Sequence, residues 1–205
     1  MRTLLFLPGV ALVMPQMVLA QQSPSARDIE RFAARARREV IVGIRVRVPD
    51  QIFRELSSRA PNDFEPCDPR ERSSLAVYRV PLAMKGEMGL AVQGRGFCYC
   101  SATGNCAFWV YRKTKGEYCL VLEADMVQVF GLLHSREQAL PILIVWSHDS
   151  GTERSANVFR FNGTKYEAAG AWIESYEYAG TNGNVRVSKK PKITSHFATT
   201  DTIPD

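Results

Sequence analysis

The cysteines are the residues of this chain whose types and spacing most readily suggest chemistry. There are five, and four of them fall within one short stretch: Cys98, Cys100, Cys106 and Cys119. A catalytic cysteine would need a histidine close in space and a lowered thiol pKa, but the three histidines are scattered through the sequence. A zinc site would need a C-x2-C knuckle or a histidine at ligand spacing, and the sequence has neither. No metal site is predicted, and disulfides are favoured.

The spacing of two cysteines predicts a short ring closed by a disulfide between Cys100 and Cys106. The Thr-Gly-Asn run between them consists of residues that tolerate left-handed turn conformations. Cys67 would then form a second bridge with Cys98 or with Cys119, and the sequence leaves both pairings open. Because the number of cysteines is odd, one is left over or pairs between chains.

A hydrolase is suggested by Asp149-Ser150-Gly151-Thr152, which matches the Asp-Ser/Thr-Gly-Thr/Ser signature of aspartic proteases. That chemistry needs two carboxylates that share a proton at close range, and the chain has no second copy of the signature. A turn is therefore the favoured interpretation of the tetrapeptide. A hydrolase that uses His148 and Asp149, or a free cysteine, is retained as an alternative. The sequence has no P-loop and no Rossmann glycine pattern, so no cofactor is predicted.

The densest run of aromatic residues surrounds the cysteines. Four of these residues form the candidate binding surface: Phe97, Tyr99, Trp109 and Tyr111. If exposed, their rings would stack against sugar rings. In strands, however, aromatic residues more often belong to the core or to cross-strand pairs. The core is therefore the favoured interpretation, and the exposed platform is the alternative.

The N-terminus predicts export. Residues 1–20 combine one basic residue, Arg2, with an apolar run and a Val-Leu-Ala end, which is the pattern of a secretory signal cleaved before Gln21. A membrane anchor would need about 20 unbroken apolar residues, and two prolines interrupt this stretch. No later segment is long enough to span a bilayer. We therefore expect a periplasmic or secreted protein without a transmembrane segment after cleavage, a setting that also suits disulfides.

Arginine is concentrated near the start of the expected mature chain. Residues 26–47 hold seven arginines against three acidic residues. This cluster would suit an anionic partner such as envelope lipid or polysaccharide, although a solvated helix face is the favoured interpretation. Nucleic-acid binding would need a basic surface interleaved with exposed aromatics, or a known module. No nucleic-acid partner is expected.

The period of the apolar residues predicts a helix–strand–helix segment over residues 21–60. Ser25 and Asp28 resemble a capping box at the start of the first helix. One apolar stripe runs along that helix: Ile29, Phe32, Ala33 and Ala36. Residues 40–48 then alternate with period two, which predicts a strand that Pro49 ends. Asp50 is placed to cap a short second helix.

Apolar runs separated by turn residues predict antiparallel strands in a β domain of residues 61–179. The expected strands are 75–80, 88–93, 106–112, 117–123, 126–133, 140–147, 156–161 and 165–169. We therefore expect a single α+β domain. In it, the N-terminal helical segment packs on an antiparallel meander of about seven or eight strands, stapled by the disulfide. Residues 180–205 are polar and predict a loosely ordered tail.

Several of these segments resemble a set of exported bacterial proteins of unknown function. The chain has the turn Cys100-Ser-Ala-Thr-Gly-Asn-Cys106 where those proteins have Cys-Gly-x-Thr-Gly-Asn-Cys. It has Val158-Phe-Arg-Phe-Asn-Gly-Thr-Lys-Tyr166 where they have a Tyr-Arg-Phe-Asp-Gly-x-x-Tyr hairpin. Members often carry, before the cysteine turn, a loop similar to the calcium loops of FG-GAP/VCBS-type repeats. Val80–Met88 stands in its place here and offers only Glu87 as a ligand, whereas calcium needs six to eight oxygens, so no calcium is predicted.

The lack of converging polar residues favours a non-enzymatic envelope or secreted module that binds a protein or polysaccharide partner. The first alternative is an inhibitor of an envelope-directed enzyme such as a lysozyme, since such inhibitors are often compact, strand-rich and disulfide-bonded. Its plug would be Pro61–Arg72 or Ser147–Arg154. The hydrolase that uses His148 and Asp149 is the second alternative.

Overall fold

The computed structural model describes residues 26–39, 43–59, 72–82, 88–134, 140–179, 186–187 and 191–197. Within these stretches lie two α-helices, one short 3-10 helix (Arg72–Ser74) and twelve strands, and the strand pairs are antiparallel. None of the helices in these stretches is long and apolar enough to cross a membrane. The predicted signal peptide, residues 1–20, lies outside the described residues.

The first sheet has five strands in the order β1-β2-β3-β4-β5. They are β1 (Ile44–Val46), β2 (Leu75–Pro81), β3 (Met88–Gly94), β4 (Cys106–Thr114) and β5 (Glu117–Val127). Helix α2 (Asp50–Arg59) covers the outer face of this sheet. Its buried residues Ile52 and Leu56 belong to one apolar cluster with Trp109 and Tyr111 of β4.

The second sheet also has five strands, in the order β12-β9-β8-β7-β6. They are β6 (Val129–Leu133), β7 (Ile142–His148), β8 (Glu153–Phe161), β9 (Tyr166–Ser175) and β12 (Lys192–Phe197). Helix α1 (Ala26–Glu39) covers its outer face. The predicted apolar stripe of this helix is confirmed, because Phe32 and Ala36 are buried in one cluster with Trp146 and Trp172. Strands β10 (Tyr178–Ala179) and β11 (Arg186–Val187) form a separate two-stranded sheet.

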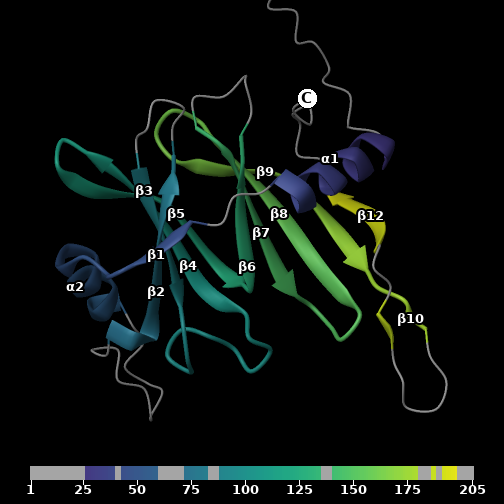
Figure 1. Cartoon of the computed structure of the whole chain (residues 1–205), viewed down its shortest axis with the longest axis horizontal. Helices are drawn as coiled ribbons and strands as arrows, with labels where there is room; N and C mark the ends of the chain where they lie inside the picture. The colour runs from purple at the N-terminus through teal and green to yellow at the C-terminus, as the bar shows by residue number, and fades with distance from the viewer. Residues whose placement is uncertain are drawn as a thin grey trace, which may run out of the picture.

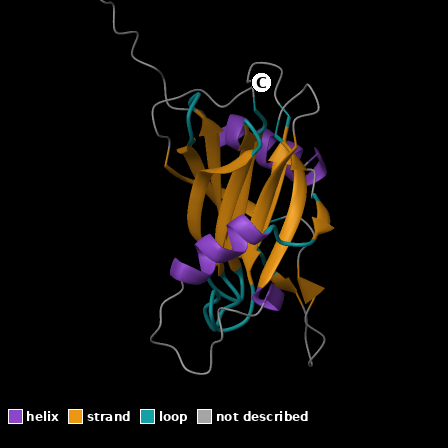
Figure 2. Cartoon of the chain, turned by 90° about the vertical axis from the view of Figure 1, so that its left-hand side faces the viewer, coloured by secondary structure: helices purple, strands orange, loops and turns teal. Residues whose placement is uncertain are grey.

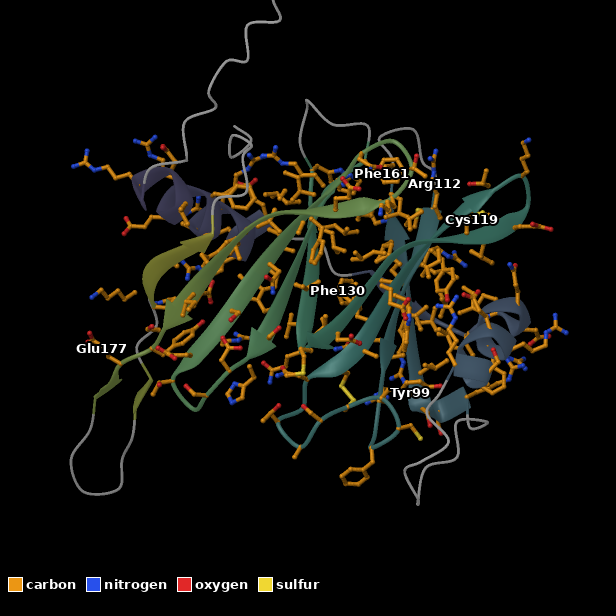
Figure 3. The ribbon with its side chains drawn as sticks, turned by 180° about the vertical axis from the view of Figure 1, so that it is seen from behind. Tyr99, Arg112, Cys119, Phe130, Phe161 and Glu177 are labelled. Atoms are coloured by element: carbon orange, nitrogen blue, oxygen red, sulfur yellow. A yellow bond between two sulfur atoms is a disulfide. The ribbon has the colours of Figure 1, made fainter. Side chains whose placement is uncertain are left out.

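The inner faces of the two sheets share one core. Val80 and Phe108 of the first sheet lie in one buried cluster with Phe130 and Val145 of the second. The rings of Phe108 and Phe130 have centres 4.9 Å apart, and Figure 3 shows Phe130 between the sheets. The layers therefore run from α2 through the first and second sheets to α1, with one helix at each end of the molecule (Figure 1). Figure 2 shows α2 lying across the strands.

The α+β class is confirmed, but the expectation of a single meander is wrong. The chain leaves the first sheet at the end of β5 and enters the second at Val129, with Gln128 between. Met126, just before this corner, has a φ of 63°, in the left-handed region, and lies where the pairing of β4 with β5 shifts register between Cys106 and Phe108. The side-chain amide of Gln93 donates to the carbonyls of Val127 and Gln128 at 3.1 and 3.0 Å, and so holds the corner.

Three strands were not predicted: β10, β11 and β12, of which β12 belongs to a five-stranded sheet. Lys192–Phe197 lies in the segment expected to be a loosely ordered tail, yet it forms β12 and pairs with β9 at the edge of the second sheet. The pairing shifts register between Ser195 and Phe197. The backbone of this polar segment completes the sheet, although its sequence has no strong apolar alternation.

Candidate functional site

A cavity of about 560 Å³ opens on the outer face of the first sheet, beside the C-terminal end of α2. We call it the cystine cavity, because one wall is the turn that contains the disulfide. It is lined by Leu56 and Arg59 of α2, residues 97–102 of the turn between β3 and β4, Ala107 and Trp109 of β4, and Glu123 and Asp125 of β5. Figure 3 shows Tyr99 at this end of the first sheet, next to α2.

The predicted disulfide closes the turn between β3 and β4. Cys100 and Cys106 are bridged, with their Cα atoms 3.9 Å apart, so this prediction is confirmed. Inside the ring, Ser101 donates its backbone N–H to the carbonyl of Asn105 at 2.8 Å, and Gly104 donates to the carbonyl of Ser101 at 3.0 Å. Gly104 has a φ of 80°, which residues with side chains seldom adopt. The ring therefore gives the cavity a wall with little freedom to move.

The same turn folds closely onto β3 through Tyr99. A Cβ atom added at Gly94 would lie 2.1 Å from the Cβ of Tyr99, so glycine is needed at that position. The rings of Tyr99 and Trp109 meet edge to face with centres 5.7 Å apart. The Tyr99 hydroxyl is buried and has no hydrogen-bond partner among the residues that the structure describes. Burial raises the pKa of Tyr99, which keeps this part of the cavity wall neutral.

Asn105 connects the cystine turn to the second sheet. Its side chain is 2% exposed and bonds twice to the backbone of His148, the last residue of β7. The amide nitrogen donates to the His148 carbonyl at 2.7 Å, and the amide oxygen accepts the His148 N–H at 2.8 Å. Because Asn105 is buried, breaking these bonds would leave polar groups unsatisfied. The second sheet therefore helps to fix the turn.

The four aromatic residues predicted as a binding surface divide into two groups. Tyr111 is 0% exposed and Trp109 is 5% exposed, because α2 covers the outer face of β4. Phe97, by contrast, is 82% exposed, and Tyr99 is partly buried. The candidate surface is therefore corrected: Phe97 and Tyr99 line the cavity together with Trp109, whereas Tyr111 is a core residue.

Charged side chains from α2 and β5 form part of the cavity wall. One oxygen of Glu123 accepts the indole N–H of Trp109 at 3.0 Å, and the other accepts a guanidinium N–H of Arg59 at 3.3 Å. Arg59 also pairs with Glu55 at 2.8 Å. Asp125 is exposed and has no hydrogen bond or ion pair to any described residue. The cavity therefore holds one engaged carboxylate and one free carboxylate.

A second cavity, of about 280 Å³, lies on the inner face of the second sheet. We call it the serine cavity. It is lined by Met126, Ser147, Asp149, Ser155, Asn157, Ala171, Trp172 and Ile173. The Ser155 hydroxyl donates a short hydrogen bond to the Asp149 carboxylate. Along β8, Ser155 and Asn157 alternate with Ala156 and Val158. The latter two belong to the cluster beneath α1, so Ser155 and Asn157 lie on the other, inner face of the sheet.

The structure does not bring His148 and Asp149 together in one pocket. Asp149 lines the serine cavity, whereas His148 lines neither cavity. Asp149-Ser150-Gly151-Thr152 is the turn between β7 and β8, as predicted. The backbone N–H groups of Asp149 and Ser150 both donate to the carbonyl of Glu153, at 3.1 and 3.2 Å. The second segment proposed as an inhibitor plug, Ser147–Arg154, is this same closed turn with its flanking strand ends. Residues 61–71 of the other segment lie outside the described residues.

Two of the three remaining cysteines lie in the described part of the chain. Cys98 is disulfide-bonded, and Cys119 is an exposed free thiol on β5. The alternative bridge to Cys119 is therefore wrong, and Cys67 lies outside the described residues. Figure 3 shows Cys119 toward the opposite end of the first sheet from Tyr99, far from the cystine turn.

A buried carboxylate beneath α1 was also missed by the sequence analysis. Glu174 of β9 is 1% exposed. One oxygen accepts the indole N–H groups of Trp172 at 3.1 Å and Trp146 at 3.4 Å, and a guanidinium N–H of Arg37 at 3.5 Å. The other oxygen accepts the Tyr176 hydroxyl at 2.8 Å. With four donors around it, this carboxylate fastens α1 to the second sheet.

Arg59, Glu123 and Asp125 have no shared sequence motif, and the only local signal is the acidic pair in the Glu-Ala-Asp run of β5. Among the residues that the structure describes, no group of three or more His, Cys, Asp or Glu side chains could hold a metal ion. Residues 83–87 of Val80–Met88, where the resemblance would place a calcium loop, lie outside the described residues.

Comparison with known proteins finds no matching family model, no matching curated protein and no matching solved structure.

Proposed function

We propose that this chain is an exported, non-enzymatic binding module that holds a ligand, or a projecting part of a partner, in the cystine cavity. The observation that carries this proposal is the cavity itself, whose volume of about 560 Å³ lies within the usual range for ligand sites. Its walls are largely apolar and aromatic, with a few polar groups from Arg59, Glu123 and Asp125. This is the composition that ligand pockets commonly have.

The rigidity of the cavity supports binding. The disulfide ring, the close packing of Tyr99 on Gly94 and the bonds from Asn105 to His148 all hold the turn in one place. A site that is ordered before the ligand arrives loses less conformational entropy on binding. The exposed Phe97 ring then offers apolar area at the mouth of a fixed frame.

The side chains in the cavity suit binding better than catalysis. The cysteines that line it, Cys98 and Cys100, are in disulfides, and its described lining residues include no histidine. Both oxygens of Glu123 already accept hydrogen bonds. Nucleophilic catalysis needs a nucleophile and a base within hydrogen-bond reach of each other, and the lining residues do not supply such a pair.

The test is capture of a partner by the mature chain and by two variants. We expect Phe97→Ser to lose most of what the unaltered chain captures from an envelope extract, because the largest exposed apolar surface of the cavity is removed. The matched control is Ile44→Ser, which removes an apolar residue that is 74% exposed but lies outside the cavity. Equal capture by Phe97→Ser and the unaltered chain, measured by quantitative mass spectrometry, would contradict the proposal.

A further inference from the structure

The aromatic rings of the cystine cavity have no cation over their faces, although the fold provides one to other rings. Elsewhere in the described part of the chain, three rings lie beneath a positive side chain: Phe53 has Arg72 at 4.5 Å, Tyr118 has Lys113 at 5.7 Å and Phe161 has Arg112 at 5.8 Å. No described cation lies over Phe97, Tyr99 or Trp109. The face of an aromatic ring attracts positive charge. The ring of Phe97, which is 82% exposed, is therefore open to a cation from outside.

The carboxylates of the cavity outnumber its positive side chains. Among the described lining residues, only Arg59 is positively charged, and its guanidinium already pairs with Glu55 at 2.8 Å and with Glu123 at 3.3 Å. Asp125 lies two residues beyond Glu123 on β5 and lines the same cavity. It is exposed and has no hydrogen bond or ion pair to any described residue. The cavity therefore presents one negative charge that the described residues do not neutralise.

The end of helix α2 adds to this negative potential. The cavity lies beside the last turn of α2, where Leu56 and Arg59 line it. Aligned peptide dipoles leave a partial negative charge at the C-terminal end of a helix, which favours cations there. An anionic ligand would be repelled by this end and by Asp125, and a neutral ligand would gain nothing from either charge. A cation is attracted by both.

We infer that the cystine cavity binds an organic cation, namely an ammonium or guanidinium group on an apolar stem. This inference rests on the proposed function and adds the class of ligand. The charged group pairs with Asp125, and the stem lies against the ring of Phe97. A carboxylate beside aromatic rings suits both parts of such a ligand. Two sources carry this chemistry: a lysine or arginine side chain of a partner polypeptide, and a free small cation such as choline.

The test compares ligands that differ in charge but not in shape, by isothermal titration calorimetry on the mature chain. The first pair consists of the blocked tripeptides Gly-Arg-Gly and Gly-citrulline-Gly, because citrulline has nearly the shape of arginine without the positive charge. Gly-Lys-Gly and choline are the other probes. We expect at least one cation to bind about fivefold or more tightly than the citrulline peptide. If no cation does so, the inference is wrong.

The same titrations identify the source of the cation. A charged tripeptide that binds more tightly than choline supports a side chain of a partner polypeptide. Choline that binds as tightly as the charged tripeptides, or more tightly, supports a free small cation.

Paired carboxylate variants separate this inference from the proposed function. Asp125→Asn should weaken binding of the cation about fivefold and leave the citrulline peptide unchanged. The melting temperature should not fall, because Asp125 has no described partner to lose. Glu117→Gln is the matched control, because Glu117 is an exposed carboxylate of the same strand that does not line the cavity. It makes the same change in net charge and should leave the affinity for the cation unaltered.

Two outcomes distinguish the failure of this inference from the failure of the proposed function. If Phe97→Ser loses the captured partner while Asp125→Asn binds every cation as the unaltered chain does, the cation inference is wrong and the proposed function stands. If Phe97→Ser captures as much as the unaltered chain, the proposed function itself is contradicted.

Discussion

The two helix-on-sheet halves of the molecule contain the same trio of side chains in different surroundings. Beneath α2, Glu123 of β5 accepts hydrogen bonds from Trp109 and from the helix residue Arg59. Beneath α1, Glu174 of β9 accepts hydrogen bonds from Trp172 and Trp146 and from the helix residue Arg37. In each half an arginine of the helix and an indole of the sheet meet on one strand carboxylate.

The difference between the halves lies in water and in the number of partners. The side chain of Glu174 is 1% exposed, whereas that of Glu123 is 53% exposed and faces the cystine cavity. Tyr176 adds a further donor to Glu174, and no described residue plays this part at Glu123. The same residue types thus build a sealed anchor in one half and the wall of an open cavity in the other. Burial, not residue type, separates the structural carboxylate from the candidate functional one.

The largest effect should come from removing the buried carboxylate. We expect Glu174→Ala to lower the free energy of unfolding by roughly 3–5 kcal/mol, since it leaves two buried indole N–H groups and the Arg37 charge without their acceptor. Glu123→Ala should cost less, about 1 kcal/mol, because its ion pair with Arg59 is exposed and the Trp109 indole N–H that loses its acceptor lines the open cavity, where water can replace the carboxylate. Urea denaturation of both variants checks this pair. If both variants lose the same free energy of unfolding, the two carboxylates stabilise the fold equally and the contrast between the two halves is wrong.

We call α2 with the first sheet the open half, and α1 with the second sheet the sealed half. The stability of the open half should depend on its disulfide in a way that the stability of the sealed half does not. Replacing Cys100 and Cys106 by serine opens a ring with a sequence separation of 6. Chain entropy then predicts a loss of about 2 kcal/mol in the free energy of unfolding. Cys119→Ser is the matched control, because Cys119 is free and exposed and should change nothing measurable. A double variant as stable as this control would mean that hydrogen bonds alone hold the turn.

Alkaline pH should weaken both halves through two tyrosines whose pKa is raised by full or partial burial. Burial raises the pKa of Tyr111 beneath α2, and Glu55 raises it further; burial raises the pKa of Tyr176 beneath α1, and Glu174 adds to that effect. In the unfolded chain a tyrosine loses its proton near pH 10, the ordinary pKa of the phenol. In the folded protein both tyrosines keep their protons to higher pH. Stability is then complete below about pH 10 and falls as the pH rises.

Tyrosine-to-phenylalanine variants assign this alkaline loss to one half or the other. Tyr111→Phe should flatten the decline above pH 10 more than Tyr176→Phe, since Tyr111 is 0% exposed and Tyr176 is only partly buried. At pH 8, Tyr176→Phe should be the costlier change, because it loses the hydrogen bond to Glu174, whereas the Tyr111 hydroxyl makes no hydrogen bond within the described part of the chain. Urea unfolding between pH 8 and pH 11 measures both. If Tyr176→Phe flattens the decline above pH 10 more than Tyr111→Phe does, burial is not the main cause of the alkaline loss of stability.

The local elements of this fold were predictable because their signals lie within a few residues. The alternation of apolar residues located β2, β3 and β4 to within about two residues at each end. The Cys100–Cys106 ring needed only a short spacing and turn-forming residues between. Helix α1 followed from its apolar stripe.

The division into two sheets had no such local signal. The corner between β5 and β6 carries no glycine or proline, and its left-handed residue is Met126. Strand pairing across that corner depends on which faces become buried, a property of the whole chain. The run Phe108-Trp109-Val110-Tyr111 is apolar at every position, which is typical of a strand covered on both faces. Recognising this would have removed Tyr111 from the candidate surface.

The cystine cavity was only half predictable for the same reason. Phe97 and Tyr99 lie in the turn that the cysteine spacing locates, so the sequence pointed to them. Arg59 and Glu123 come from elements far apart in the chain and meet only because α2 packs on β4 and β5. No pattern in one strand reveals which residue of a distant helix will pair with it.

The smallest expected effect concerns the strained residue on the edge of the open half. Met126→Gly removes a cost of roughly 1–2 kcal/mol for the left-handed backbone, but glycine loses roughly 0.5–1 kcal/mol in conformational entropy on folding. We therefore expect a gain of about 0.5 kcal/mol in the free energy of unfolding. The control is Met88→Gly, at a methionine that is 40% exposed and whose φ is not positive. There only the entropic cost applies, so that variant should be destabilised. If Met126→Gly is destabilised as much as this control, the methionine side chain stabilises the corner, and strain does not distinguish the open half from the sealed one.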